Sequence, residues 1–483
     1  MYSVTIDQEN ITNKVDGEVI VMERKIAWLD YMEEDKLQLE ILSKNYREFL
    51  DNGKTERECI KQSVAFAKQA GYRDLGQCIK DKTQLKAGDK VYAVNMDKAI
   101  VLFNIGKEPL DEGMNILGAH IDSPRLDIKQ NPLYEKGGLA YFDTHYYGGI
   151  KKYQWVTLPL AIHGVIAKKD GSLINLTIGE KDGDPVFCVT DLLVHLAQKQ
   201  QELKANKVID GEDLDVLIGS IPLDDKEKEA VSKKIMAILQ STYDFTEEDL
   251  LSAELEVVPA GKARDAGLDR SMIMAYGQDD RVCAYTSLVA MLEVDKVDKT
   301  TCCLLVDKEE IGSVGATGMQ SKFFENMTAE LLALQGEYSD LKLRRCLANS
   351  KMLSSDVSAG FDPLYESVFD KKNVAYLGNG MVFNKFTGSR GKAGSNDANA
   401  EYMGHIRDIF DKEKVHFQTA ELGRVDLGGG GTIAYILALY GMNVIDSGVA
   451  VLNMHAPWEA TSKADVYEAK RGYQAFLKRA EKI

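Results

Sequence analysis

Two adjacent carboxylates follow an apolar run near the middle of the chain. The segment Leu304–Ser313 (LLVDKEEIGS) contains Glu309 and Glu310, followed by Gly312. The apolar run predicts a buried strand whose C-terminal end delivers both acids into a turn, and ligands of open α/β sheets bind at such ends. Neighbouring side chains of a strand point to opposite sides, so the two glutamates would have different tasks. Taken alone, the pattern also describes a solvated loop with two surface glutamates.

Histidines and further carboxylates recur at other expected strand ends. Each is weak evidence alone, because a lone histidine is commonly a core residue and an isolated aspartate at a turn is usually a cap. Together, two histidines and three carboxylates form the mixed nitrogen and oxygen donor set of hydrolytic zinc or cobalt sites. Divided over two ions with one bridging carboxylate, five residues give each ion three protein ligands. The five are His120, Asp279, Glu310, Asp356 and His455.

Two further acids could serve such a site without binding metal. Asp122 follows His120 by two residues, so both would lie on one face of a strand, and Asp122 would accept the second imidazole N–H. Glu309 stays free when Glu310 binds metal. A free carboxylate there would take a proton from a water molecule and pass it to a leaving amine. The chemistry that this set favours is metal-assisted hydrolysis of an amide.

The elements that must position these residues alternate between helix and strand. Residues 23–52 have helical spacing of apolar side chains and stop at Asn52, and Thr55 with Glu58 forms a capping box that begins the next helix. Further helices are expected at 282–292 and 464–479. Short apolar runs predict strands at 91–94, 99–103, 114–119, 301–306, 351–356 and 449–454.

A β-rich stretch interrupts this series. It follows the breaker-rich segment Gln130–Gly138, which is typical of a domain exit, and returns near Glu254–Gly261. The sequence therefore predicts an α/β fold in which helices flank a central mixed sheet, with a β-rich domain inserted into it. We place the outer domain at residues 1–128 and 263–483 and the insert at 129–262, sizes that are ordinary for domains.

Composition narrows the class of protein. The chain is 45% hydrophobic and 28% charged, as in soluble globular proteins, and its net charge of −16 argues against nucleic acid or anionic membranes as partners. No run is long enough to cross a bilayer, and residues 1–10 lack the basic start and apolar core of a signal peptide. Seven cysteines without a C-x-x-C pair are typical of a reducing compartment, so we expect a cytoplasmic protein.

Five short segments carry a resemblance to a known family. They are Gly118–Pro124 (GAHIDSP), Gln278–Arg281 (QDDR), Glu309–Ser313 (EEIGS), Ser354–Asp356 (SSD) and Asn453–His455 (NMH). In order and spacing they resemble the aspartyl aminopeptidase and vacuolar aminopeptidase I family of di-metal aminopeptidases, over most of the chain. The resemblance implies a metalloaminopeptidase for short peptides, an insert that mediates dimerisation, and dimers that assemble into a hollow tetrahedral dodecamer.

The resemblance also implies how the ligands divide. Asp279 would bridge two divalent ions in each subunit. His120 and Asp356 would complete the site of one ion, and Glu310 and His455 that of the other. Zinc is the metal that the family implies first, with cobalt and manganese as alternatives.

Four further features follow from the same resemblance. Glu309 would be the general base, and the peptide bond between Asp279 and Asp280 would be cis. His195 resembles a histidine of the insert that reaches a neighbouring subunit's active site, although a helix-face histidine at the dimer contact explains it equally well. Lys385 lies near the position of a lysine that meets an acidic substrate side chain in relatives, and a solvated surface lysine is its alternative.

The chain departs from the family pattern in three places. The segment Gly148–Leu158 lacks the Phe-Asp-Arg-Asp sequence of relatives that prefer acidic residues, and Lys308 stands where relatives often have histidine. Leu427–Thr432 (LGGGGT) replaces a family loop beside the substrate, and its four glycines would allow close backbone approach to a ligand. We therefore expect the reaction and leave a preference for acidic N-terminal residues open.

Two alternatives to an aminopeptidase remain at this point. A related di-metal deacylase or carboxypeptidase would need a basic group to receive a substrate carboxylate. A catalytically inactive, self-assembling scaffold would have no chemical need for Glu309 and all five ligands together, so the complete set argues against it.

Overall fold

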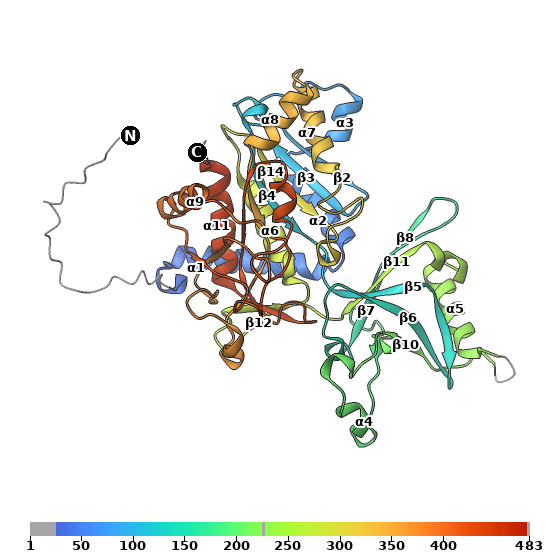
Figure 1. The fold of residues 1–483 in the computed structure, drawn as a ribbon. Helices are drawn as coiled ribbons and strands as arrows, with labels where there is room; N and C mark the ends of the chain where they lie inside the picture. The colour runs from blue at the N-terminus through green and yellow to red at the C-terminus, as the bar shows by residue number, and fades with distance from the viewer. Residues whose placement is uncertain (1–25, 225–227, 481–483) are drawn as a thin grey trace, which may run out of the picture.

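The structure, a computed structural model, describes residues 26–224 and 228–480. The first ten residues, which lack a signal-peptide pattern, lie outside the described residues, as do residues 23–25 of the helix expected at 23–52. Figure 1 shows two units side by side: a larger unit of mixed helices and strands, and a β-rich unit formed by the middle of the chain. The expected α/β fold with a β-rich unit is confirmed.

A nine-stranded mixed sheet forms the centre of the larger unit. Its four middle strands are mutually parallel, in the order β14 (Thr301–Val306), β4 (Asn115–His120), β15 (Lys351–Ser355) and β19 (Asn443–Gly448). β14, β4 and β15 are buried at every residue, as expected for parallel strands covered on both faces. Because the strands are parallel, their C-terminal ends meet at one edge of the sheet.

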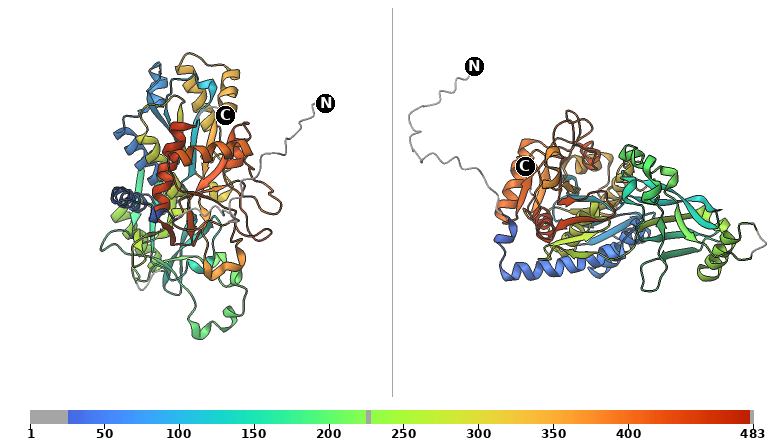
Figure 2. Two further views of the ribbon diagram at one scale, coloured as in Figure 1. Left: turned by 90° about the vertical axis from the view of Figure 1, so that its left-hand side faces the viewer. Right: turned by 90° about the horizontal axis from the view of Figure 1, so that it is seen from below.

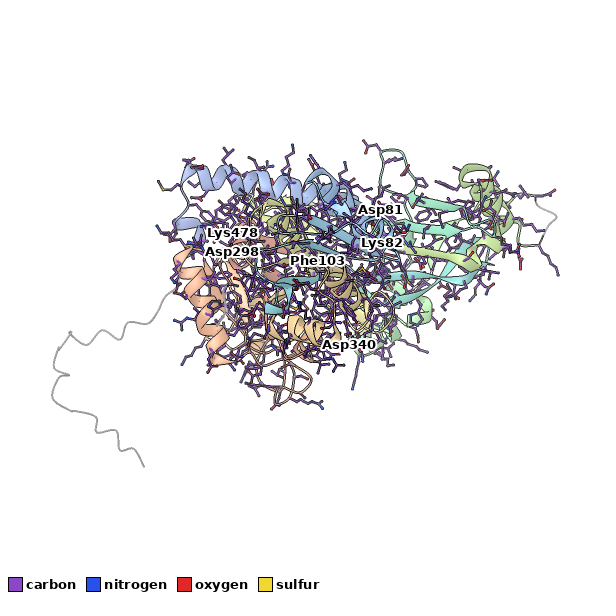
Figure 3. All side chains as sticks on the ribbon, turned by 90° about the horizontal axis from the view of Figure 1, so that it is seen from above. Asp81, Lys82, Phe103, Asp298, Asp340 and Lys478 are labelled. Atoms are coloured by element: carbon purple, nitrogen blue, oxygen red, sulfur yellow. The ribbon has the colours of Figure 1, made fainter. Side chains whose placement is uncertain are left out.

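Outer strands extend the sheet on both sides. One side carries β3 (Ala99–Asn104), β2 (Lys90–Asn95) and β1 (Arg73–Asp74), and the other β17 (Met381–Asn384) and β18 (Phe417–Thr419). Phe103 of β3 is fully buried inside the larger unit (Figure 3). The flanking strands thus leave none of the four parallel strands at a lateral edge of the sheet.

Helices cover both faces of the sheet, and each face has its own hydrophobic core. Alternate residues of β14 separate accordingly: Cys303 and Leu305 belong to one core, Cys302 and Leu304 to the other. The first core is covered by α1 (Glu33–Asn52), α2 (Glu56–Gln69), α6 (Gln278–Glu293), α9 (Ala400–Lys412) and α11 (Lys463–Arg479). The second is covered by α3 (Leu75–Lys80), α7 (Phe323–Leu334), α8 (Asp340–Asn349) and α10 (Ala434–Ala438).

The helix expected at 23–52 begins only at Glu33, after a 3-10 turn at Ala27–Leu29, whereas its end and the start of the next helix are as predicted. α1 stops at Asn52, and the Thr55 and Glu58 capping box begins α2. α1 runs along the outside of the larger unit towards the β-rich unit (Figure 2). Among the described residues, none of the helices combines the length and the apolarity that crossing a membrane requires.

The β-rich unit is built on a seven-stranded antiparallel sheet. Its strands lie in the order β8 (Leu173–Ile178), β7 (Leu160–Ala167), β11 (Ala253–Pro259), β5 (Arg125–Lys136), β6 (Leu139–Tyr147), β10 (Val216–Gly219) and β9 (Cys188–Val189). Helix α5 (Ala230–Tyr243) packs against β5, β6 and β10. A separate hydrophobic core lies between these elements.

The expected domain exit at Gln130–Gly138 is wrong. β5 continues through Asn131 and Pro132, because a register irregularity between Ile128 and Leu133 takes up the proline, and the chain turns only at Gly137–Gly138. The division placed between residues 128 and 129 falls inside this strand. The sheet of the β-rich unit therefore begins at Arg125, and the exact domain limits stay a prediction.

A third, five-stranded sheet lies beside the edge where the parallel strands end. Its order is β12 (Arg264–Ala266), β13 (Met272–Ala275), β21 (Glu459–Ser462), β20 (Ala450–Leu452) and β16 (Ser358–Ala359). The strand expected at 449–454 is thus only the short β20, and β19 before it was not expected. This small sheet positions the turn between β20 and β21 and the start of α6.

Candidate metal centre

The fold brings the five expected ligands to one place. His120 is the last residue of β4, Asp356 directly follows β15, and Glu310 lies in the turn after β14. His455 lies in the turn between β20 and β21. Asp279 was expected at a strand end but lies in the first turn of α6, at a residue with non-helical backbone angles.

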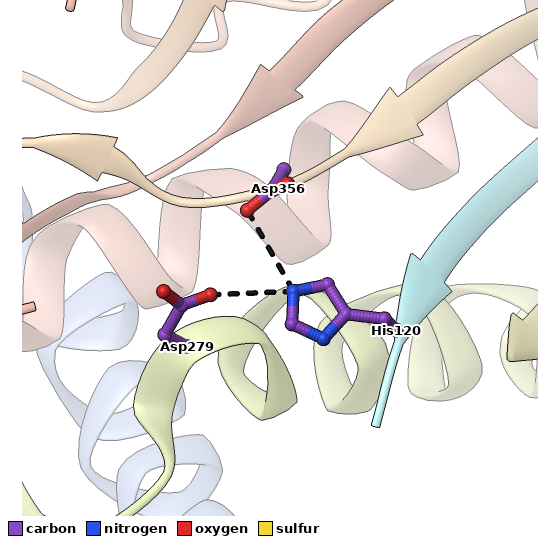
Figure 4. Close-up of side chains that lie close together, drawn as sticks. All are labelled: His120, Asp279 and Asp356. Atoms are coloured by element: carbon purple, nitrogen blue, oxygen red, sulfur yellow. Dashed lines mark ion pairs between the residues drawn. The ribbon is translucent and has the colours of Figure 1, made fainter. Parts of the chain in front are cut away.

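Asp279 contacts both histidines. Its Oδ1 is 3.3 Å from His120 Nε2 and its Oδ2 is 3.3 Å from His455 Nε2. His120 Nε2 is also 3.8 Å from Asp356 Oδ1, and Figure 4 shows both contacts of this histidine. On the other side, His455 Nε2 is 3.7 Å from Glu310 Oε2. Two overlapping groups of three donors share Asp279, and a third group consists of His120, Glu309 and Glu310; the donor atoms of each group lie within 4.8 Å of one another.

The two glutamates lie in a 3-10 turn (Glu309–Ile311), not on the strand itself. Strand alternation is therefore the wrong reason for their separation. The turn lies between Lys308 and Gly312, whose φ angles of 69° and 97° are left-handed. Glu309 Oε2 lies 3.9 Å from His120 Nε2, whereas Glu310 approaches His455, so the two acids still face different parts of the site.

Asp122 holds the turn that carries both glutamates. Its carboxylate accepts the backbone N–H groups of Glu309 and Glu310, each at 3.1 Å, and the hydroxyl of Tyr147 at 2.8 Å. His120 Nδ1 is 3.0 Å from the backbone carbonyl of Asp122 and 3.3 Å from its carboxylate. The expected strand geometry does not apply, because β4 ends at His120. Through these contacts Asp122 holds the glutamate turn and the His120 ring, and its part in catalysis stays a prediction.

Glu459 is a functional residue that sequence reasoning missed. It is 1% exposed, and its two oxygens accept the backbone N–H groups of Asp279 at 3.0 Å and of His455 at 2.8 Å. Ser123 Oγ adds a hydrogen bond to the carbonyl of Asp279 at 2.6 Å. The peptide bond between Asp279 and Asp280 is cis, as the resemblance implied. The available signal was an acid four residues after a candidate histidine ligand.

The electrostatics of the site fit bound cations. Burial raises the pKa of Glu309 to about 8, and burial with the nearby Asp279 carboxylate raises the pKa of Glu310. Burial lowers the pKa of His455, yet Asp279 and Glu310 together raise it to about 10. In the described part of the chain, Glu310 Oε1 is buried without a hydrogen-bond partner. Divalent cations would favour the ionised form of these crowded carboxylates. They would also give the buried free oxygen of Glu310 a partner.

A cavity of about 750 Å³ opens beside the ligands. The residues Gly428–Gly431, which we call the glycine segment, form part of its wall, and none of the described residues that line it is a lysine or an arginine. Its apolar side chains include Val368, Phe369, Leu422 and Met454. The arrangement allows a small molecule to lie against the ligands and to pack a side chain on an apolar surface.

The two expected substrate contacts do not reach this cavity within the subunit. His195 is exposed in a 3-10 turn (Val194–Leu196) of the β-rich unit, and its contact with a neighbouring subunit stays a prediction. The Lys385 ammonium pairs with the carboxylate of Asp397 and does not line the cavity, so the expected substrate contact of Lys385 has no support in the structure.

Comparison with known proteins decides the family. The sequence profile of the family described as aminopeptidase I zinc metalloprotease (M18) matches residues 49–477. The chain belongs to the M18 aminopeptidase family. A probable M18 family aminopeptidase 1 of Clostridium acetobutylicum is 62% identical over 459 residues, which cover 95% of this chain and 99% of that relative.

Solved structures of M18 aminopeptidases share the fold. The crystal structure of the M18 aminopeptidase of Thermotoga maritima matches with a TM-score of 0.90 at 44% identity, over 95% of this chain and all (100%) of that one. The S. cerevisiae mApe1 dodecamer matches with a TM-score of 0.74 at 19% identity, over 92% of this chain and 97% of that one. Membership of M18 makes the protein a metalloaminopeptidase, in preference to a deacylase, a carboxypeptidase or an inactive scaffold.

Proposed function

We propose that the protein removes single N-terminal residues from short peptides, by hydrolysis at two divalent ions. The observation that carries this proposal is the sharing of Asp279 by two groups of three donors. One ion would be held by His120, Asp279 and Asp356, and the other by Asp279, Glu310 and His455. The imidazole and carboxylate donors suit zinc, with cobalt or manganese as alternatives. When bound, the ions would polarise the scissile carbonyl and lower the pKa of a water molecule.

Glu309 would move the proton in this reaction. Its carboxylate lies at the edge of the ligand set, near His120, and burial raises its pKa to about 8. Two cations bound beside it would keep this carboxylate ionised, so it would accept a proton from the attacking water and return it to the leaving amine. Asp122 would hold Glu309 in place through the backbone of the turn.

The substrate would have an uncharged N-terminal side chain. An acidic side chain needs a basic partner, and none of the described residues that line the cavity is a lysine or an arginine. The apolar wall of the cavity favours a side chain such as leucine or methionine.

We also propose that copies of the chain assemble through the β-rich unit, as the dodecamer of the distant yeast relative suggests. A short segment of this unit exposes Leu192, Leu193, Val194, Leu196 and Leu203. Exposed apolar clusters of this kind mark interaction sites. Assembly into a tetrahedral dodecamer would bring His195 close to a neighbouring site, and the free cysteines suit a cytoplasmic location.

A panel of aminoacyl substrates tests this proposal. We expect release of N-terminal leucine and methionine, weak release of aspartate and glutamate, and loss of all release after chelation, restored by zinc, cobalt or manganese. Peptides with an acetylated N-terminus are the matched control and should stay intact, since an aminopeptidase needs the free amine. Cleavage of the acetylated peptides, or undiminished release after complete removal of metal, would refute the proposal.

A further inference from the structure

The glycine segment of the cavity wall is fixed at its start. The N–H of Gly428 donates to the carbonyl of Arg424 at 2.9 Å, and the N–H of Gly430 donates to the carbonyl of Thr387 at 2.9 Å. A side chain at Gly428 would place its Cβ 1.7 Å from the carbonyl oxygen of Leu422, so the chain must be glycine at this close approach.

Thr432 and Asp446 fix the other end of the segment. The hydroxyl of Thr432 donates to Asp446 Oδ1 at 2.6 Å, and both residues are buried. Asp446 belongs to β19, where its backbone pairs with Ser354 of β15 and with Asn384 of β17. The carboxyl group is thus held by the central sheet, between two neighbouring strands.

Two side chains act on the carboxyl group of Asp446: the hydroxyl of Thr432 and the carboxylate of Asp356, a candidate metal ligand. Asp446 Oδ2 is buried and has no hydrogen-bond partner among the described residues. Burial raises the pKa of Asp446 to about 8, although the hydrogen bond from Thr432 opposes this shift. Burying an acid costs stability unless it is hydrogen-bonded. The one side chain that donates a hydrogen bond to Asp446 is that of Thr432, in the wall of the cavity.

The middle of the glycine segment presents bare backbone to the cavity. A Cβ placed at Gly430 or Gly431 would have no atom within 4 Å, and both residues line the cavity. A strip without side chains defines a smooth wall only if its ends are fixed, because glycine has the greatest conformational freedom of all residues.

We propose that Asp446 is a positioning residue of the aminopeptidase reaction, which through Thr432 fixes the glycine segment as the wall against which the substrate packs. This proposal rests on the proposed function. Asp446 touches no reacting atom in this scheme. It acts on substrate binding, whereas the metal ligands and Glu309 act on the chemical step.

Kinetics of Thr432 and Asp446 variants test the proposal. Loss of one buried hydrogen bond should raise KM about tenfold in Thr432→Val, with kcat within about twofold of wild type. Asp446→Ala should act in the same direction. Thr432→Ser keeps the hydroxyl and should restore KM. Metal content per subunit should be the same in all variants.

A matched control separates positioning from lost stability. Thr328 is also a buried threonine, whose hydroxyl donates to the carbonyl of Phe324 at 2.9 Å in α7, away from the cavity. Thr328→Val should reduce thermal stability as Thr432→Val does, but leave KM unchanged. An equal rise of KM in Thr328→Val, or an unchanged KM in Thr432→Val, would overturn the proposal.

Hydrogen exchange tests the same inference without any activity. Amides of residues 428–432 should exchange faster in Thr432→Val than in wild type or in Thr432→Ser, while those of β4 and β15 stay protected. Equal exchange in all three would overturn the positioning role. If wild type released no N-terminal residue, the proposed function would fail, and the exchange result would still decide whether Asp446 fixes the segment.

Discussion

At the scale of single residues, the site depends on two carboxylates. Asp279 faces two histidines, and Glu459 holds Asp279 in place. Asp279 contacts His120 and His455 through different oxygens, each at 3.3 Å. Glu459 accepts the backbone N–H of Asp279 and that of His455, so it fixes Asp279 and one of the two histidines together. Residues that orient ligands in this way tune the affinity for metal.

Glu459→Gln should therefore weaken metal binding. Glutamine has one acceptor oxygen, so one of the two N–H groups would lose its partner and face an NH₂ group. We expect metal affinity to fall by about 10-fold to 100-fold, measured by competition with a chromophoric chelator.

Glu468 provides the matched control for this substitution. It is also fully buried, and it accepts the backbone N–H of His416 at 2.8 Å and the hydroxyl of Tyr31 at 2.9 Å. Glu468→Gln should reduce stability but leave metal affinity unchanged. Equal metal affinity in Glu459→Gln and wild type would show that Glu459 does not hold the ligands.

The candidate ligands and Asp122 could be predicted from sequence, but the way in which Asp122 and Glu459 hold the site could not. Glu310 and His120 end apolar runs, which is a local pattern. Glu459 acts on the backbone of Asp279, far away along the chain, and Asp122 acts on the backbone of the glutamate turn. Such contacts depend on how the sheets come together, so only the structure shows them.

At the scale of elements, four parallel strands explain why distant segments meet. The sequence predicts β14, β4 and β15 because each is an apolar run. It does not predict β19 (NVIDSG), because that strand buries Asp446 and Ser447 in place of apolar side chains. It also misplaces the exit to the β-rich unit, since a proline inside β5 looks like a break.

The larger unit and the β-rich unit meet at a buried cluster of charges. His163 of β7 contacts Glu58 of α2 at 2.9 Å and Glu180 at 3.1 Å, and Glu180 contacts Lys54 at 2.5 Å. Burial lowers the pKa of His163, but its hydrogen bonds with Glu180 and Glu58 more than offset this and raise it above 6.5. The folded state therefore holds this proton more tightly than the unfolded state.

The raised pKa of His163 predicts how stability depends on pH. Its contribution to the free energy of unfolding is fully present below pH 6.5 and is lost as pH rises through the higher pKa of the folded state. His163→Gln should remove this part of the slope in denaturant unfolding across that range. His145→Gln, at an exposed histidine of β6, is the control and should keep the slope. An unchanged slope in His163→Gln would contradict the prediction.

At the scale of the whole molecule, the exposed apolar segment of the β-rich unit should mediate assembly. The side chains of Leu193 and Leu196 are 60% and 70% exposed in the single chain. Charges at both positions, in the double variant Leu193→Asp and Leu196→Asp, should dissociate the assembly, as measured by light scattering or mass photometry. Leu268→Asp, at a fully exposed leucine of the larger unit, should leave it intact. A monomeric wild-type protein would rule out the dodecamer.

We expect Glu310 to bind metal and the adjacent Glu309 to transfer the proton. The most direct test is the turnover of Glu309→Gln, measured together with the metal content of the same sample. We predict two ions per subunit, as in wild type, and a kcat lower by about 10²-fold to 10⁴-fold, the usual contribution of a general base. Undiminished turnover in Glu309→Gln with both ions bound would show that Glu309 is not the general base.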